Sequence, residues 1–218
     1  QTLKINPDGS LTALYAFGRK GNALGEFKNI GDLVIKDNYL FVTDTENDSI
    51  QTLKINPDGS LTALYTFGKK GSALGEFYMP FSGAIKEDLL FVSDTGNHRI
   101  QTLKINPDGS LTALYAFGKK GESLGKFISP ALLAIKDRFL WVMEVGFSED
   151  SLGLLRIGNQ RIQVLEIKPN GTLSPKFTFG KRGQNLGEFD MPSGIEIKGD
   201  FLYITDSRNR IQVLEIKY

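Results

Sequence analysis

The sequence predicts an all-β fold, a β-propeller built from four-stranded antiparallel blades, and three observations support this prediction. The stretch QTLKINPDGSLTALY occurs three times without a change, starting at Gln1, Gln51 and Gln101. Within each repeat, short segments of alternating polar and apolar residues indicate strands. A repeat of about 50 residues suits a propeller blade, and a lone blade cannot bury both of its faces, so neighbouring blades must stack.

The second repeat illustrates the order of the expected strands, which lie over residues 51–55, 60–68, 82–86 and 89–94. The first two alternate in polarity, and Pro57 and Gly59 favour the tight turn between them. A glycine-rich loop over 69–77 leads to a short strand of small and apolar residues. The last segment is apolar on both sides, which is typical of a well-buried strand.

A fourth, diverged copy runs from Ile162 to Arg210, and the start of a fifth copy follows it. We therefore expect one domain over 1–218, with repeats at about 1–50, 51–100, 101–161, 162–210 and 211–218. Blade strands are named A to D from the axis outward. The A strands are expected near 31–36, 81–86, 131–136 and 193–198, and the B strands near 39–44, 89–94, 139–144 and 201–206.

The number of expected strands gives four blades and predicts how the ring closes. The chain begins and ends at a C strand, so residues 10–18 can supply the D strand of the last blade in a velcro closure between the termini. One C strand, 1–5 or 209–217, is then left without a place, and an unpaired strand invites self-association. The alternative is a larger ring that is truncated or completed by a second chain.

The segment GEFYMPFSGAIKEDLLFVSDTGNHRIQTLKI at 75–105 resembles an NHL repeat, through its G-x-F entry, its proline, its small-residue inner strand and the run VSDTGNHRIQ. Residues 187–216 are similar, 25–55 match less well and 125–167 match least. The resemblance implies an NHL-type propeller in which an aspartate caps the turn between strands B and C. It assigns this structural role to Asp44, Asp94 and Asp206. Asn97 and Arg99 are the expected partners of Asp94.

The composition excludes several kinds of site. The chain has no cysteine, which excludes disulfides and thiolate ligands, and its single histidine, His98, is too few for a zinc centre. Glu144 stands where the other repeats have the capping aspartate, which is expected to break any four-fold ring of carboxylates. We predict no metal and no cofactor. The net charge of +1 gives no general attraction to nucleic acid or membranes, and no apolar run approaches the ~20 residues of a membrane span.

Four pairs of basic residues are the main binding candidates, because they recur in the loop between strand D of one blade and strand A of the next. They are Arg19, Lys20, Lys69, Lys70, Lys119, Lys120, Lys181 and Arg182. These D–A loops emerge on the top face, where a ring of cations would suit phosphates or an acidic partner. Glu26, Glu76 and Glu188 would neutralise part of this field. His98 and Phe147, the latter in an insertion over 146–156, complete the candidate face.

These features lead us to expect a non-catalytic binding or scaffolding module, not an enzyme. Differences between the first two repeats concentrate in their last 23 positions, which contain the inner strands and their loops. The module would bind a protein, a peptide or a small ligand through the loops of the top face. One alternative is RNA or polyanion binding through the dibasic loops. Another is an engineered or recently amplified repeat propeller without a defined ligand.

Overall fold

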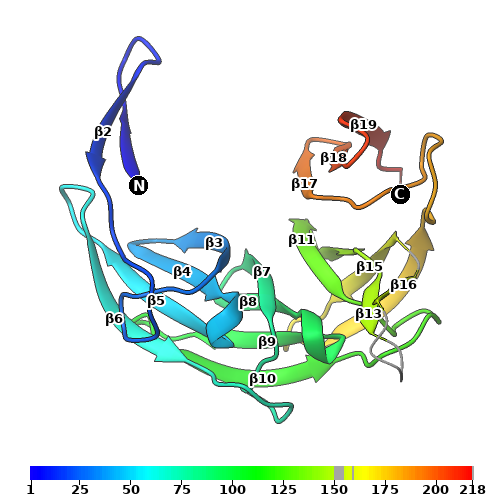
Figure 1. The fold of residues 1–218 in the computed structure, drawn as a ribbon, viewed down its shortest axis with the longest axis horizontal. Coiled ribbons are helices and arrows are strands. Elements are labelled where there is room, and N and C mark those ends of the chain that lie inside the picture. Colours follow the sequence, from blue (N-terminus) through cyan, green and yellow to red (C-terminus); the bar gives the residue numbers. More distant parts are fainter. Residues whose placement is uncertain (150–154, 159, 218) are drawn as a thin grey trace.

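The structure is a computed structural model that describes residues 1–149, 155–158 and 160–217, with no side chains described over 147–157. Within these ranges it contains strands and two short 3-10 turns, η1 (Thr45–Asn47) and η2 (Thr95–Asn97). The sheets are arranged as blades around a common centre (Figure 1). The predicted all-β, four-bladed propeller is therefore confirmed.

Three blades have four antiparallel strands each, in the predicted A to D order. The first comprises β3 (Ile30–Lys36), β4 (Tyr39–Asp44), β5 (Ser49–Ile55) and β6 (Leu61–Phe67). The second comprises β7 (Pro80–Lys86), β8 (Leu89–Asp94), β9 (Arg99–Ile105) and β10 (Leu111–Phe117). The third comprises β11 (Pro130–Lys136), β12 (Phe139–Glu144), β15 (Arg161–Ile167) and β16 (Leu173–Phe179). Because side chains alternate along a strand, each blade presents one row to either neighbour.

The velcro closure between the termini is not formed in this structure. The sequence places 10–18 beside the last blade, whereas β2 (Leu11–Tyr15) pairs with β1 (Thr2–Ile5) in a separate hairpin. The fourth blade has three strands, β17 (Gly194–Lys198), β18 (Phe201–Asp206) and β19 (Arg210–Glu215).

The reason lies in the repeat itself, because β1 and β19 hold the same place in it. A tight turn joins β1 to β2, so their pairing costs less chain entropy than pairing β2 with the distant β19. The ring therefore keeps an opening between the hairpin and the fourth blade, and no strand pairing among the described residues closes it (Figure 1).

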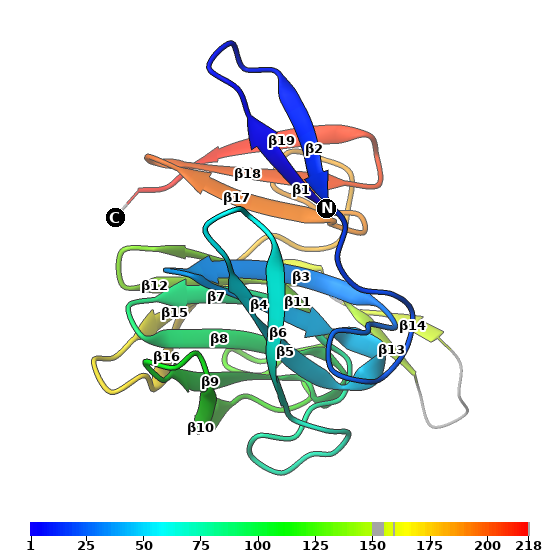
Figure 2. The same cartoon turned by 90° about the vertical axis from the view of Figure 1, so that its left-hand side faces the viewer.

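The insertion in the third blade forms a second small hairpin. Its strands are β13 (Phe147–Glu149) and β14 (Leu155–Ile157), and they pair antiparallel. The hairpin projects from the side of the molecule where the D–A loops emerge (Figure 2). The backbone thus extends the top face beside the third blade.

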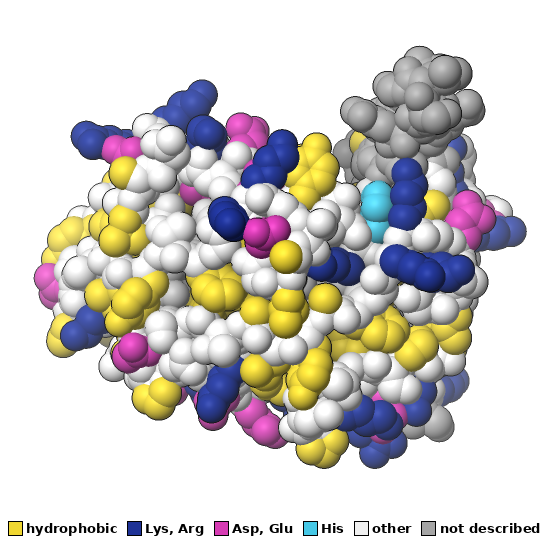
Figure 3. Space-filling view, turned by 90° about the horizontal axis from the view of Figure 1, so that it is seen from below, with side chains coloured by type: hydrophobic (Ala, Val, Ile, Leu, Met, Phe, Trp, Pro, Cys, Tyr) yellow, Lys and Arg dark blue, Asp and Glu magenta, His cyan; other side chains and the backbone are white. Residues whose placement is uncertain are grey.

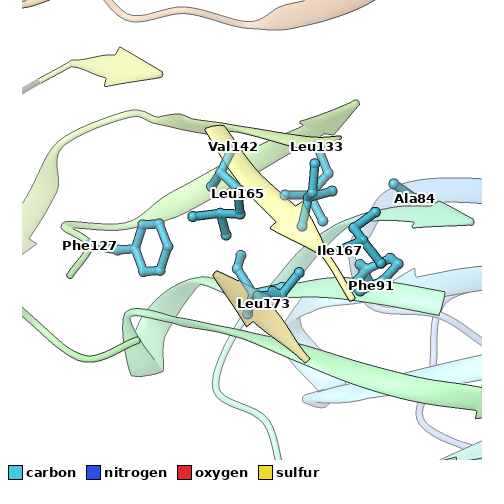
Figure 4. Close-up of a cluster of buried hydrophobic side chains, with 10 residues drawn as sticks. Ala84, Phe91, Phe127, Leu133, Val142, Leu165, Ile167 and Leu173 are labelled. Atoms are coloured by element: carbon cyan, nitrogen blue, oxygen red, sulfur yellow. The ribbon is translucent and has the colours of Figure 1, made fainter. Parts of the chain in front are cut away.

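The apolar core consists of layers between successive blades. Between the second and third blades, Ala84 and Phe91 lie opposite Leu133, Leu165 and Ile167 (Figure 4). Full burial of one such leucine, isoleucine or phenylalanine contributes about 1.5–3 kcal/mol to folding. Stacking of blades is therefore what stabilises each sheet.

One phenylalanine per repeat packs against the D–A loop that leads into each blade. Phe77, Phe127 and Phe189 are fully buried, and Phe27 is 8% exposed. The ring of Phe77 lies so close to Gly68 that a Cβ there would be 2.5 Å from it, and Gly68 has a φ of +91°. Glycine at this position is therefore required by both space and backbone conformation.

The described residues contain no helix long and apolar enough to cross a membrane.

Candidate functional site

A buried acid at the end of each B strand anchors the turn that follows. Asp94 has no exposed surface and accepts hydrogen bonds from the Tyr78 N–H (2.8 Å), the Asn97 amide (2.9 Å) and the Arg99 Nε (2.7 Å). The pairing with Asn97 and Arg99 that the family resemblance implies is therefore present. Arg99 also donates to the carbonyl of Glu76 at 2.9 Å, so the network ties the B–C turn to the D–A loop.

The first and fourth blades use the same position with different partners. Asp44 accepts a hydrogen bond from Asn47 at 2.7 Å, but Ser49 stands where the second blade has an arginine, so Asp44 faces no cation in its own turn. Asp206 pairs with Arg210 at 2.9 Å. All three aspartates therefore form hydrogen bonds or ion pairs within their own turns.

The expectation that Glu144 breaks the series does not hold in the structure. Glu144 is fully buried, accepts the Ile128 N–H at 2.6 Å and pairs with Arg161 at 2.7 Å, so its longer side chain fills the aspartate position. Burial raises the pKa of Glu144, although hydrogen bonds from Ile128, Gln163 and Arg161 oppose the rise. The described residues contain no group of three histidine or acidic side chains that could hold a metal ion.

The basic pairs do not form a uniform ring of free cations. In three D–A loops the first basic residue pairs with the glutamate of its own loop: Arg19 with Glu26 (2.7 Å), Lys69 with Glu76 (3.3 Å) and Lys181 with Glu188 (3.2 Å). The second basic residues, Lys20, Lys70, Lys120 and Arg182, form backbone bridges beside the core phenylalanines. Lys70 additionally lies over the Tyr78 ring, 4.9 Å from its centroid.

Each of these glutamates is also held by the backbone of its loop. The second carboxylate oxygen accepts the N–H of Ala23 (3.2 Å), of Ala73 (3.1 Å), or of Gln184 and Asn185 (3.0 and 3.1 Å). The pKa of all three glutamates lies below the usual range. The main cause is the hydrogen bond from Arg19 in the first loop and the hydrogen bonds from backbone N–H groups in the other two loops. The loop is thus a small carboxylate-binding structure.

The third D–A loop differs at one decisive position. Residue 126 is lysine, and its side chain lies over Gly121 as that of Glu26 lies over Gly21. Lys119 forms no ion pair among the described residues, and the Ser123 N–H, which corresponds to the Ala73 donor, has no acceptor among them. The third loop therefore keeps the donors that bind a carboxylate elsewhere and has the cation Lys126 at the position of the bound acid. Its one acid, Glu122, stands at the position of Asn22 and Ser72.

His98 lies at the end of η2, beside this loop. Its Nδ1 accepts the Ser129 N–H at 3.1 Å, so in the neutral ring the proton is on Nε2. Burial, followed by the charge of Lys120, lowers the pKa of His98, and the charge of Asp94 opposes this effect. The His98 carbonyl lies 3.5 Å from the position of a Cβ on Gly118, the residue before the basic pair. Figure 3 shows basic side chains around the single histidine.

The Nδ1 contact of His98 also has counterparts at the neighbouring blade junctions. Asp48 accepts the Met79 N–H at 2.8 Å, and Gln160 accepts the Met191 N–H at 3.0 Å. This contact therefore joins one blade to the next whatever the residue type. Only the second blade has an imidazole Nε2 donor at this position.

The sequence predictions named all four D–A loops as binding candidates and did not distinguish between them. The charge of Lys120 acts on His98, and Lys119 precedes Lys120 in the same loop. Arg19, Lys69 and Lys181, by contrast, each pair with the glutamate of their own loop. The side chain of Phe147 lies outside the described residues. The contribution of Lys126 was missed, although the change from GEF to GKF is visible when the four loops are aligned.

Comparisons with known proteins support the propeller and do not assign a protein family to the whole chain. A model of the LVIVD repeat, a β-propeller repeat type, matches residues 191–216. No curated protein matches the sequence. The predicted resemblance therefore holds at the level of a propeller repeat, and the NHL type in particular is not shown.

Solved structures share the fold over nearly all of the chain. A Bacteroides uniformis protein provisionally named a 6-phosphogluconolactonase is 17% identical, with 98% of this chain and 59% of that one covered and a TM-score of 0.65. A Bacteroides fragilis protein with the same provisional name is 17% identical, with 98% and 72% covered and a TM-score of 0.53. The periplasmic gluconolactonase of Pseudomonas aeruginosa is 12% identical, with 98% and 77% covered and a TM-score of 0.51.

These matches correct the prediction of a non-catalytic binding or scaffolding module. Three structures of this architecture carry lactonase names, so the architecture is no sign of a non-catalytic role. At identities of 12–17% the likeness itself shows the fold alone. The chain spans 59% of the length of the first of these structures.

Proposed function

We propose that the chain hydrolyses a sugar lactone that bears a negatively charged group, and that the third D–A loop holds this group. The observation that supports the proposal is the replacement of the loop glutamate by Lys126 while the cation Lys119 and the Ser123 N–H are retained. In the other loops these same donors bind a carboxylate of the chain itself. A carboxylate or phosphate of a ligand fits the third loop for the same reason.

The reaction needs little beyond positioning and charge stabilisation. Water adds to the lactone carbonyl carbon, the ring C–O bond breaks, and the products at neutral pH are a hydroxycarboxylate and a proton. Negative charge develops on the carbonyl oxygen, and a neutral donor such as the His98 Nε2–H stabilises such charge. The names of the structural neighbours favour a lactone over other esters. We also propose that the repeats are of the NHL type, on the residues of 75–105 and 187–216.

The test is a lactonase assay that follows proton release from 6-phosphoglucono-δ-lactone and from unphosphorylated glucono-δ-lactone. Both open spontaneously, so the rate without protein is subtracted. We expect acceleration of the phosphorylated substrate by the wild-type chain. The Lys126→Glu variant, which restores the arrangement of the other loops, should raise KM roughly 10- to 100-fold, since a hydrogen bond to a charged group contributes about 1.5–3 kcal/mol.

A matched control is available in the second loop. Lys69→Glu introduces the same change of charge where the native loop already has its own glutamate. This variant should leave KM for the phosphorylated lactone within about two-fold of wild type, because a distant surface charge is screened by salt. Absence of acceleration above the spontaneous rate with both lactones would refute the proposed function.

A further inference from the structure

Successive blades are joined by hydroxyl groups at the ends of the B strands. Thr43 donates to the Phe81 carbonyl at 2.6 Å, and Thr45 donates to the carbonyl of the preceding residue at 2.9 Å. In the second blade Ser93 and Thr95 make the equivalent bonds to the third blade, both at 2.7 Å. Together with the contact of Asp48 to the next blade, these side chains form a repeated inter-blade latch.

The fourth blade carries this latch set without a following blade to bind. Thr205 and Ser207 occupy the hydroxyl positions, and Asn209 occupies the position of Asp48 with the same left-handed backbone, φ +55°. Among the described residues Thr205 and Ser207 bond only within their own blade, and the side-chain amide of Asn209 forms no hydrogen bond. The third blade, by contrast, has Met143 and Val145 at the hydroxyl positions.

The apolar residues on the same face of the fourth blade are also uncovered. Ile211 is 67% exposed, whereas its counterparts Ile50, Ile100 and Ile162 are fully buried against the next blade. Tyr203 is 36% exposed, and the aromatic residues at its position in the three other blades are at most 5% exposed. Phe201 and Val213 extend the patch. Exposed apolar patches of this kind mark interaction sites.

The first blade presents the complementary face. On β3, Leu33 and Ile35 are 55% and 58% exposed, whereas Leu133 at the position of Leu33 is 7% exposed. The hairpin β1–β2 already lies over the outer strands of this blade, since Tyr15 donates to Asp58 at 3.3 Å. The uncovered part is therefore the inner strand, where strands A and B of a preceding blade would pack.

We propose that the exposed face of the fourth blade docks onto the first blade of a second copy of this chain, in a head-to-tail arrangement. Thr205 would then donate to the Gly31 carbonyl of the other copy, Ser207 to its Ile30 carbonyl, and Asn209 would accept its Asn29 N–H. At the junction between the first and second blades, Phe81, Pro80 and Met79 hold the positions that correspond to Gly31, Ile30 and Asn29, and they make the equivalent hydrogen bonds. The surface therefore has both the donors and the acceptors of an interface that the chain already makes with itself.

The curvature of the chain favours a second copy over its own first blade. The blades follow an arc in which the hairpin and the fourth blade stand apart (Figure 1). The same arc superposes on 59% of the longer Bacteroides uniformis propeller with a TM-score of 0.65. Two such arcs have enough blades to complete one ring, and head-to-tail contacts close into a ring when the rotation allows it.

Docking also provides a fourth strand for the incomplete blade. β19 has a free edge, and β2 of the second copy has the sequence of the D strand that belongs there. Since β1 and β19 hold the same place in the repeat, β2 would exchange β1 for β19. The exchange keeps the number of strand pairs and gives Leu11, 61% exposed here, a buried position like that of Leu111, 8% exposed.

The experiment is light scattering on the 218-residue chain and on variants at the two faces. The wild type should have twice the chain mass of 24.1 kDa. Ile211→Asp and Ile35→Asp alter residues that are exposed in the single chain, so each should fold and have the mass of one chain. Leu186→Asp is the control: Leu186 is 77% exposed in a D–A loop, and its counterparts Leu74 and Leu124 stay 50% and 45% exposed beside a neighbouring blade. This variant should remain a dimer.

Mixing the two face variants tests the head-to-tail arrangement. Ile211→Asp keeps an intact first blade and Ile35→Asp keeps an intact fourth blade, so the mixture should recover a two-chain species through one native interface. A wild type that stays at the mass of one chain over a wide concentration range would overturn the proposal. So would a dimer of Ile35→Asp alone, because it would show that fourth blades pair with each other.

Discussion

The ion pair of the second blade gives the sharpest prediction about stability. Asp94 is fully buried and pairs with Arg99, whose side chain is 13% exposed, and the first blade has the same aspartate position, Asp44, without an arginine. Removing one partner of a buried pair costs about 3–5 kcal/mol, because the other charge is left without compensation. Arg99 keeps carbonyl acceptors in the D–A loop, so we expect Asp94→Asn to cost about 3 kcal/mol, at the lower end.

The matched control is Asp44→Asn in the first blade. It weakens hydrogen bonds but uncovers no charge, so it should cost about 1–2 kcal/mol. The double variant Asp94→Asn/Arg99→Ser gives the second turn the arrangement of the Asp44→Asn variant, an asparagine without an arginine, and it should recover part of the loss seen in Asp94→Asn. The comparison therefore separates the charge from the hydrogen bonds.

The assay is urea unfolding followed by circular dichroism, combined with hydrogen exchange resolved by blade. Exchange is needed because repeat architectures unfold in parts, so one transition does not report on every blade. We expect faster exchange over residues 89–105 in Asp94→Asn than over 39–55 in Asp44→Asn. Equal costs for the two single variants, or a double variant no more stable than Asp94→Asn, would refute the reasoning.

Two further predictions use residues that the repeats make comparable. Leu103 is fully buried and Leu3, in an identical stretch, is 44% exposed, so Leu103→Ala should cost about 3–5 kcal/mol and Leu3→Ala less than about 1 kcal/mol in the same urea assay. Because the pKa of His98 is lowered by folding, the folded state binds fewer protons than the unfolded state near pH 6. The contribution of His98 to the free energy of unfolding is therefore present above the pKa of an ordinary histidine and is lost as the pH falls below it. His98→Gln, which copies Gln160, should reduce the loss of melting temperature between neutral and mildly acid pH; an unchanged loss would contradict this role.

The blades could be predicted from the sequence because their determinants are local. Polar and apolar side chains alternate along blade strands of five to seven residues, and glycine and proline define the turns. Ring closure depends on contacts between distant segments, and there the repeat works against prediction. β1 and β19 hold the same place in the repeat and share its spacing of leucine and isoleucine, so pattern alone does not decide which of them pairs with β2.

The candidate site was predicted in part, and the missing part is geometric. The basic pairs and the nearby glutamates are visible in the sequence, but their pairing within each loop depends on the fold of the loop. Only the structure shows that the glutamate is held by backbone N–H groups as well, and hence that Lys126 leaves a set of donors in place. The length of Glu144 also hid its equivalence to the aspartates, because a longer side chain reaches the same donors.

The central claim is that the third D–A loop binds an anionic group, and calorimetric titration of the chain with 6-phosphogluconate tests it most directly. We predict one site per chain, with an affinity that falls as salt rises and is lost in Lys126→Glu but kept in Lys69→Glu. An affinity that is the same in Lys126→Glu and wild type, or no binding to the wild type, would contradict the account.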